Sequence, residues 1–147
     1  MYSFQHILVP VDGSANSQRA MHYASYLAEH CQAKIGVLHV VNLSLAMSPM
    51  GQINTGGYIP ERVVEDLQES GRLIIDKALQ QVPPAVTAQG FLEMGVPSEV
   101  IVAFCRENAY DLIVMGSRGL GTIKEFFLGS VSNYVLHHAA CPVMVAK

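Results

Sequence analysis

The segment 111–132, DLIVMGSRGLGTIKEFFLGSVS, constrains the fold of this chain more than any other part of it. It opens with the apolar run Leu112–Met115, which is short and β-branched at its centre, as expected for a central strand covered on both faces of a parallel sheet. Glycines follow the run at once. A helical apolar pattern begins near Ser130, and a serine there is a good N-cap. The segment is therefore predicted to form a strand, a glycine loop and a helix start.

The glycine loop is a candidate anion site. Gly116, Gly119 and Gly121 can adopt left-handed backbone conformations or bring the main chain close to a ligand. The N–H groups at the start of the following helix, together with the positive end of its dipole, favour a phosphate. The spacing matches neither the Walker loop, which needs Lys at Thr122, nor the dinucleotide fingerprint, which needs a glycine at Lys124. On the residues alone, a phosphate site and a plain turn both remain open.

The rest of the chain alternates between strand and helix patterns. Its 147 residues correspond to about one domain, residues 1–147. Half of the residues are hydrophobic and 14% are charged, which is typical of a sheet covered on both faces. Apolar periodicity predicts strands that alternate strictly with helices. The predicted strands are 7–11, 35–41, 86–94, 112–115 and 141–146, and the predicted helices occupy 14–31, 60–82, 97–108 and 130–139.

This alternation predicts a single-domain, doubly wound α/β fold with a five-stranded parallel sheet and four helices. In the strand order 3-2-1-4-5, the half-polar strand 86–94 and the strand 141–146 form the two edges. Ligands bind such sheets at the carboxyl ends of the strands where the order reverses, here between the first and fourth strands. The loops 12–14 and 116–130 meet there. The segment 42–59, rich in Gly, Ser and Asn, is predicted to be a long surface loop.

Charge and composition exclude several partners. Twelve acidic against nine basic residues give a net charge of −3, and no Lys/Arg cluster provides the footprint of nucleic-acid binding. No apolar stretch approaches the roughly 18 residues of a membrane span, and the first residues carry no signal-peptide pattern. Cys31, Cys105 and Cys141 are predicted to be small buried hydrophobes in a reducing compartment. We therefore expect a cytoplasmic protein without membrane insertion.

Other polar residues admit two interpretations. Asp12 either caps the first helix or contacts a ligand, and its place at the reversal of strand order favours the ligand. Arg118 and Lys124 either offset phosphate charge or are solvated loop charges. His39 is interpreted as a core histidine with satisfied hydrogen bonds. A zinc site near the C-terminus is disfavoured because no four-ligand pattern is present. The candidate zinc ligands are His137, His138 and Cys141.

Several motifs, taken together, resemble the ATP-binding branch of the universal stress protein family. The resemblance covers essentially the whole chain. It implies the same Rossmann-like fold, a regulatory role in the stress response, and ATP, ADP or AMP as the ligand with Mg²⁺ or Mn²⁺ on the phosphates. The motifs are Ile7-Leu-Val-Pro-Val-Asp-Gly-Ser14, Leu38-His39-Val40, Gly95-x-Pro97, Asp111-Leu-Ile-Val-Met-Gly-Ser-Arg-Gly119, Gly116-x2-Gly119-x9-Gly129-Ser130 and Cys141-Pro142-Val143.

The resemblance also implies the role of individual residues in nucleotide binding. One set matches the family positions that lie around the adenine and ribose, and a second set matches the phosphate cradle. The adenine and ribose positions are Pro10, Val11, Asp12, Val40, Met115 and Gly116. The phosphate positions are Gly119, Gly129, Ser130 and Val131.

Two classes of function remain. The leading hypothesis is a nucleotide-binding regulatory protein with at most slow ATP hydrolysis. The alternative is an ATPase or nucleotidyl-transfer enzyme of the related adenine-binding α/β group, but the sequence shows no His-x-Gly-His motif, no Walker lysine and no placed base. A homodimer is expected through the last strand, residues 142–146, which is short, apolar and free of the charges that normally protect a sheet edge. The resemblance implies the same pairing.

Overall fold

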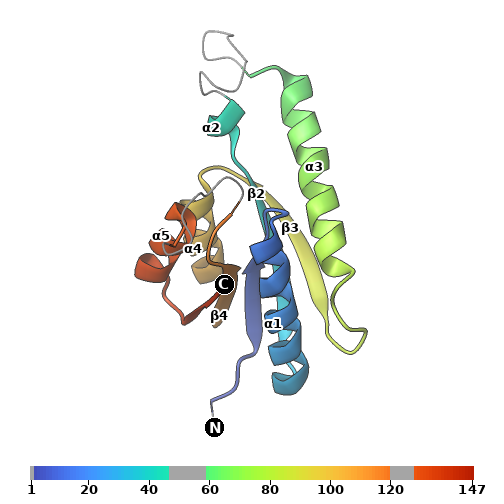
Figure 1. Ribbon diagram of the computed structural model, residues 1–147, viewed down its shortest axis with the longest axis vertical. Coiled ribbons are helices and arrows are strands. Elements are labelled where there is room, and N and C mark those ends of the chain that lie inside the picture. The colour runs from blue at the N-terminus through green and yellow to red at the C-terminus, as the bar shows by residue number, and fades with distance from the viewer. Residues whose placement is uncertain (1, 47–58, 120–127) are drawn as a thin grey trace.

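The computed structural model describes residues 2–46, 59–119 and 128–147, which form a parallel sheet between two layers of helices (Figure 1). The strands in these ranges are β1 (His6–Pro10), β2 (Lys34–Val41), β3 (Ala88–Met94), β4 (Leu112–Gly116) and β5 (Val143–Ala146). The long helices are α1 (Ala15–Cys31), α3 (Glu61–Leu79), α4 (Pro97–Glu107) and α5 (Ser130–His138).

The sheet has the strand order β3-β2-β1-β4-β5, which confirms the predicted topology. Strand β1 lies at the centre and pairs in parallel with β2 from His6↔Lys34 to Pro10↔Leu38, and with β4 at Ile7↔Leu112. Strands β3 and β5 are the edges, as expected. The carboxyl ends of β1 and β4 are therefore neighbours, and the reversal of strand order lies between them.

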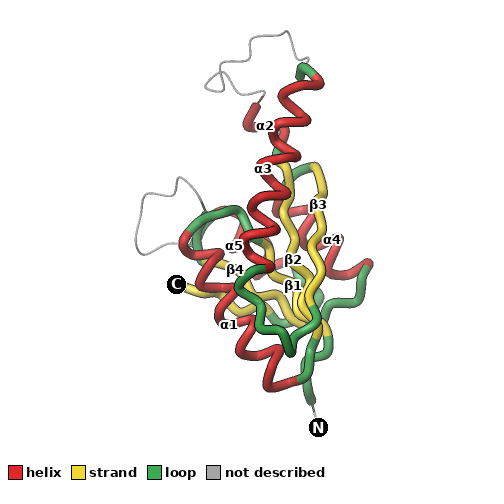
Figure 2. Tube along the Cα trace, turned by 90° about the vertical axis from the view of Figure 1, so that its right-hand side faces the viewer, coloured by secondary structure: helices red, strands yellow, loops and turns green. Residues whose placement is uncertain are grey.

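Alternate residues of the central strands fill two separate cores. Ile7 and Val9 of β1 belong to the core under α1 and α3, whereas Leu8 belongs to the core under α4 and α5. All three are 0% exposed. Because both faces are covered, these strands consist of unbroken apolar runs. Figure 2 shows that the N-terminal part of α3 extends past the carboxyl ends of β2 and β3.

Two local predictions need correction. The segment 42–59 is not loop throughout, because Leu43–Ala46 forms a short helix, α2; residues 47–58 lie outside the described ranges. Ser130 is not the N-cap of α5 but its first helical residue, and Gly129 holds the cap position. The N–H of Gly129 donates to the Ser117 carbonyl at 2.7 Å, so a contact with the end of β4 sets this helix start.

The ends of α1 and α4 share one geometry. Gln32 and Ala109 follow the helices with positive φ angles of 58° and 54°. The next residue in each case reaches back into the helix, with Ala33 N–H donating to Ala28 O at 2.9 Å and Tyr110 N–H donating to Cys105 O at 3.0 Å. This is the Schellman arrangement, which usually has glycine at the left-handed position.

The amino end of the sheet is closed by side chains. The carboxylate of Asp111 accepts hydrogen bonds from the N–H groups of Gln5 at 2.8 Å and His6 at 3.1 Å. Nearby, the sulfur atoms of Cys105 and Cys141 lie 3.3 Å apart as free thiols. Burial and the hydrogen bond with Cys141 raise the pKa of Cys105 to about 12. Only Cys105 is fully buried, since Cys31 and Cys141 are half-buried.

Candidate functional site

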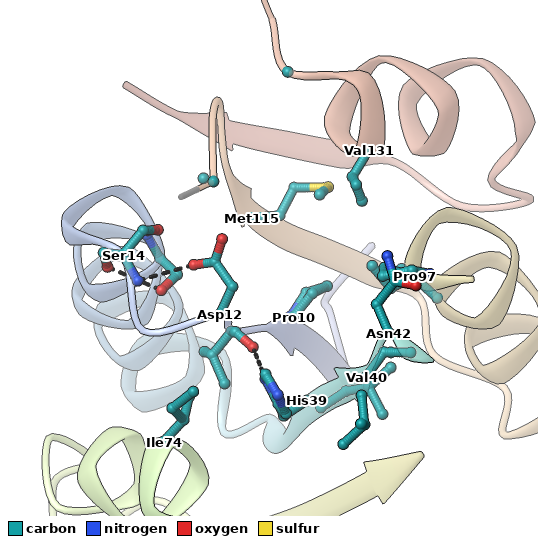
Figure 3. A pocket seen from close by; sticks show the side chains of 18 of the residues that line it. Pro10, Asp12, Ser14, His39, Val40, Asn42, Ile74, Pro97, Met115 and Val131 are labelled. Carbon is teal, nitrogen blue, oxygen red and sulfur yellow. Dashed lines mark hydrogen bonds between the residues drawn. The ribbon is translucent and has the colours of Figure 1, made fainter. Parts of the chain in front are cut away.

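A pocket of about 750 Å³ opens at the carboxyl ends of β1, β2 and β4 (Figure 3). The residues predicted as nucleotide contacts come from four separate stretches of the chain, and all of them line this pocket. They are Pro10, Val11, Asp12, Val40, Met115, Gly116, Gly119, Gly129, Ser130 and Val131.

Asp12 stands between β1 and α1 with its carboxylate in the pocket. Its Oδ1 accepts a hydrogen bond from the N–H of Ser14 at 2.9 Å, which closes a tight turn through Gly13, whose φ is +85°. The N-cap of α1 is Ser14, whose hydroxyl accepts from the N–H of Ser17 at 3.2 Å. The capping interpretation of Asp12 is therefore wrong. A Cβ at Gly119 would overlap its carboxylate, so the absence of a side chain there leaves room for Asp12.

The end of β4 packs tightly against the first turn of α1. A Cβ at Gly116 would lie 2.8 Å from the Cβ of Asn16 and 3.0 Å from the nitrogen of Ser17, so glycine is needed for this contact. The side-chain amide of Asn16 then donates to the Arg118 carbonyl at 3.2 Å. Among the described glycines, positive φ occurs at Gly13 and Gly95 and not at Gly116 or Gly119. Close approach, rather than left-handed backbone, explains the two loop glycines that are described.

The first turn of α5 borders the same pocket. The hydroxyl of Ser132 shares its one proton between two carbonyls, Ser117 O at 2.7 Å and Gly129 O at 3.0 Å, which holds this turn against the end of β4. Helix geometry leaves the N–H groups of the first turn without acceptors inside the helix. Ser130 and Val131 both line the pocket. The arrangement offers main-chain donors and the positive end of a helix dipole to an anion.

The end of β2 offers main-chain groups of both kinds. The N–H of Gly95 in the β3–α4 turn bonds to the Val41 carbonyl at 3.0 Å, so Val41 directs its main-chain groups toward β3. Residues alternate along a strand, so the N–H and C=O of Val40 point the other way, toward β1. Strand β1 ends at Pro10, and Val40 lies beyond that end in the pocket. His39 is half-buried, and its Nδ1 lies 2.7 Å from the Val11 carbonyl, as expected for a satisfied histidine.

One wall of the pocket was missed in the sequence. It comes from α3, at positions that recur every three or four residues along one helix face. Helical spacing alone does not reveal such a wall, because a stripe that faces a pocket has the same spacing as one that faces a core. The α3 residues in the wall are Val63, Leu67, Ser70 and Ile74, and further lining residues that were not predicted include Ser14, Asn42 and Pro97.

The other candidate residues differ in whether they line the pocket. Arg118 lines the pocket, whereas Lys124 lies outside the described ranges, as do Gly121 and Thr122. His137 and His138 are exposed, and the Nδ1 of each lies within 2.9 Å of the carbonyl four residues earlier. Within residues 2–46, 59–119 and 128–147, no three His, Cys, Asp or Glu side chains are grouped as metal ligands. Nor does this part of the chain contain a helix long and apolar enough to cross a membrane.

Comparison with known proteins gives the family. The model of the Universal stress protein family matches residues 3–147. The chain belongs to the universal stress protein family. It is 31% identical to universal stress protein YxiE of Bacillus subtilis over 149 aligned residues, which cover 98% of this chain and 99% of YxiE.

Solved structures of the family share this fold. Universal stress protein UspA from Lactobacillus plantarum has a TM-score of 0.78 and 26% identity, with 100% of both chains covered. A universal stress protein family protein from Arabidopsis thaliana, solved with AMP bound, has a TM-score of 0.66 and 22% identity, with 97% of this chain and 91% of that chain covered.

Proposed function

We propose that this universal stress protein binds an adenine nucleotide, ATP with Mg²⁺ or Mn²⁺, in the pocket at the carboxyl end of the sheet. It would act as a cytoplasmic regulatory protein of the stress response that reports nucleotide occupancy. One observation carries the proposal: the ten residues matched to nucleotide contacts all line a single pocket of about 750 Å³. That volume lies within the range of roughly 300–1,000 Å³ common for small-molecule sites.

The chemistry of the lining suits each part of such a ligand. Pro10, Val40 and Met115 provide an apolar surface for a base, and the outward N–H and C=O of Val40 complement the N1 acceptor and N6 donor of adenine. The first turn of α5 suits phosphates. A divalent ion would be held mostly by phosphate oxygens and water. The AMP bound to the Arabidopsis protein is consistent with this class of ligand.

Rapid turnover is not part of the proposed function. Among the described lining residues, the candidate bases are Asp12 and His39. The first accepts from Ser14 N–H, and the second is hydrogen-bonded through Nδ1 to the Val11 carbonyl. Neither is accompanied by a Walker lysine or a His-x-Gly-His motif in the sequence, so the groups that phosphoryl or nucleotidyl transfer normally uses are missing around them. We expect a turnover number far below the enzyme median of about 10 s⁻¹.

The test removes one main-chain donor from the proposed phosphate site. Proline is well tolerated at the first position of a helix, and Gly129 before it is extended with ψ 162°, as a residue preceding proline prefers. Ser130→Pro should therefore fold normally but lose one charge-assisted hydrogen bond to phosphate. By calorimetry its affinity for Mg·ATP should fall roughly 10- to 100-fold.

Ser130→Ala is the matched control, since it removes the hydroxyl and keeps the N–H. Its affinity should stay close to that of the wild type. Equal affinities of the Pro and Ala variants would contradict the phosphate assignment. A wild type that binds no ATP, ADP or AMP would contradict the proposed function as a whole.

We also propose that two copies pair through β5. The N–H of Ile113 donates to Pro142 O at 3.0 Å and that of Ser117 donates to Ala146 O at 2.7 Å, so even-numbered residues of β5 face β4. By alternation, Val143 and Val145 direct their main-chain groups outward, where a second β5 related by two-fold symmetry could pair antiparallel.

A further inference from the structure

The main-chain hydrogen-bond ladder between β1 and β2 stops one bond short of the expected continuation. In a parallel pair, a residue donates to one partner residue and accepts from the residue two positions further along. Val11 N–H donates to Leu38 O at 2.8 Å, so a continued ladder would have Val40 N–H donate to the Val11 carbonyl. The register instead ends at Pro10↔Leu38. The Val11 carbonyl lies 2.7 Å from Nδ1 of His39, a contact drawn as a dashed line in Figure 3.

The structure gives the His39 ring a fitted place under α3. A Cβ on Gly71, in the middle of that helix, would lie 2.7 Å from Cδ2 of His39 and 2.7 Å from Cδ1 of Leu92, so glycine makes the space that the ring and this leucine occupy. Glycine in a helix interior costs about 1 kcal/mol relative to alanine. Because a carbonyl can only accept, the contact with Val11 requires the proton on Nδ1. The tautomer and the position of the ring are both determined by the fold.

We propose that His39 is a positioning residue for base recognition: it holds the Val11 carbonyl and so keeps the N–H of Val40 available to the base. This inference rests on the proposed function. With Val40 N–H and C=O both turned to the ligand, the site fits a base with an acceptor next to a donor, as in 6-aminopurines. A 6-oxopurine carries a donor at N1 and an acceptor at O6, so it meets the same two groups with the wrong polarity.

Two variants separate the hydrogen bond from the bulk of the ring. His39→Leu removes the donor, so the Val11 carbonyl should return to Val40 N–H. His39→Asn is the conservative control, because its side-chain amide nitrogen can reach the place of Nδ1. Gly71→Ala pushes on the ring from α3 and leaves His39 itself unchanged, so it should shift each measurement in the same direction as His39→Leu.

The first measurement needs no ligand. Amide hydrogen exchange of Val40, followed by NMR on the folded protein, should be fast in the wild type and in His39→Asn. In His39→Leu it should slow at least about 10-fold, because the N–H gains an acceptor. A Val40 amide that exchanges at the same rate in all these proteins would overturn the proposal.

The second measurement is the ratio of the affinities for ATP and ITP. The wild type and His39→Asn should prefer ATP, whereas His39→Leu should lose roughly 10-fold of its ATP affinity and keep its ITP affinity. A wild type that binds ATP, with the same ratio in His39→Leu, would refute the role of His39 and leave the proposed function standing. A wild type that binds neither nucleotide would refute both.

Discussion

The main-chain groups at the two ends of the sheet differ in their surroundings. At the amino end, the Asp111 carboxylate accepts from the N–H groups of Gln5 and His6, and the N–H of Asp111 returns a bond to His6 O at 3.0 Å. At the carboxyl end, the main-chain groups of Val40 and the first turn of α5 border a pocket. The protein closes one end with its own side chain and, under the proposed function, closes the other with a ligand.

The partners of the two aspartates explain the difference. Asp111, just before β4, accepts from two N–H groups at the start of the neighbouring β1. Asp12, just after β1, accepts from the N–H of Ser14 at the start of α1. The same residue type beside a strand thus serves stability at one end and, under the proposed function, contacts the ligand at the other.

The largest expected effect is a loss of ATP affinity when side chains are added to two glycines of the pocket at the carboxyl end. The double variant Gly119→Val and Gly129→Val should reduce ATP affinity by more than about 100-fold, or about 3 kcal/mol, by calorimetry. The fold should survive, because among the described residues a Cβ at Gly119 displaces the end of the Asp12 side chain, and at Gly129 the closest contacts of a Cβ are at 3.4 Å.

The matched control fills a glycine toward the opposite end. Gly36→Ala would overlap the Tyr110 hydroxyl, so it should cost roughly 1–3 kcal/mol of unfolding free energy and leave affinity unchanged. If the double variant lost stability and kept its affinity, the assignment of the two ends would be reversed.

The second prediction separates the pocket from the sheet edge. Val143→Pro and Val145→Pro each remove an outward N–H and should convert a dimer to a monomer at micromolar concentration, measured by sedimentation. No described residue of β5 lines the pocket, so ATP affinity should not change. Met144→Pro instead removes an N–H that faces β4 and should lower stability. A monomeric wild type, or proline variants that remain fully dimeric, would place the interface elsewhere or remove it.

The sequence was enough for the topology and for the ten predicted pocket residues. Strict alternation of apolar runs and helical patterns leaves few topologies, and in the order 3-2-1-4-5 residues such as Asp12 and Gly119 lie directly beside the reversal point. The contact between the Asn16 amide and the Arg118 carbonyl was out of reach, because it joins residues 102 positions apart. So was the place of Ser130, since serine is a good N-cap by propensity and the bond from Gly129 to Ser117 overrides that preference.

The third prediction concerns the amino end alone. Asp111→Ala leaves the N–H groups of Gln5 and His6 without their carboxylate acceptor, and because both bonds are exposed, the free energy of unfolding should fall by roughly 0.5–1.5 kcal/mol in urea titrations. Asp111→Asn keeps one acceptor oxygen and should lose less. Affinity for ATP should match that of the wild type in both variants, and a clear loss would mean that the two ends are coupled.

The smallest effect is a pH dependence that also belongs to the amino end. Burial and the bond with Cys141 raise the pKa of Cys105 from an ordinary value of 9.0 to about 12, and burial also raises the pKa of Tyr110. The unfolded chain ionises first, so stability is fully present below pH 9.0 and is lost as the pH rises toward about 12.

Urea titrations at about pH 8 and about pH 10.5 should show this loss. It should be smaller in Cys105→Ala, whereas Cys31→Ala, in which Cys105 remains, should follow the wild type. Equal alkaline losses in the wild type and Cys105→Ala would remove the thiol from the explanation.

The stability of this chain could be raised at the two left-handed residues that follow α1 and α4. A non-glycine residue in that conformation costs about 1 kcal/mol, and both Gln32 and Ala109 adopt it. Gln32→Gly and Ala109→Gly would recover part of that strain at positions that do not line the pocket. Such a background would tolerate harmful substitutions in the binding site that the natural chain would not survive, and so would widen the set of ligand specificities that laboratory evolution can reach.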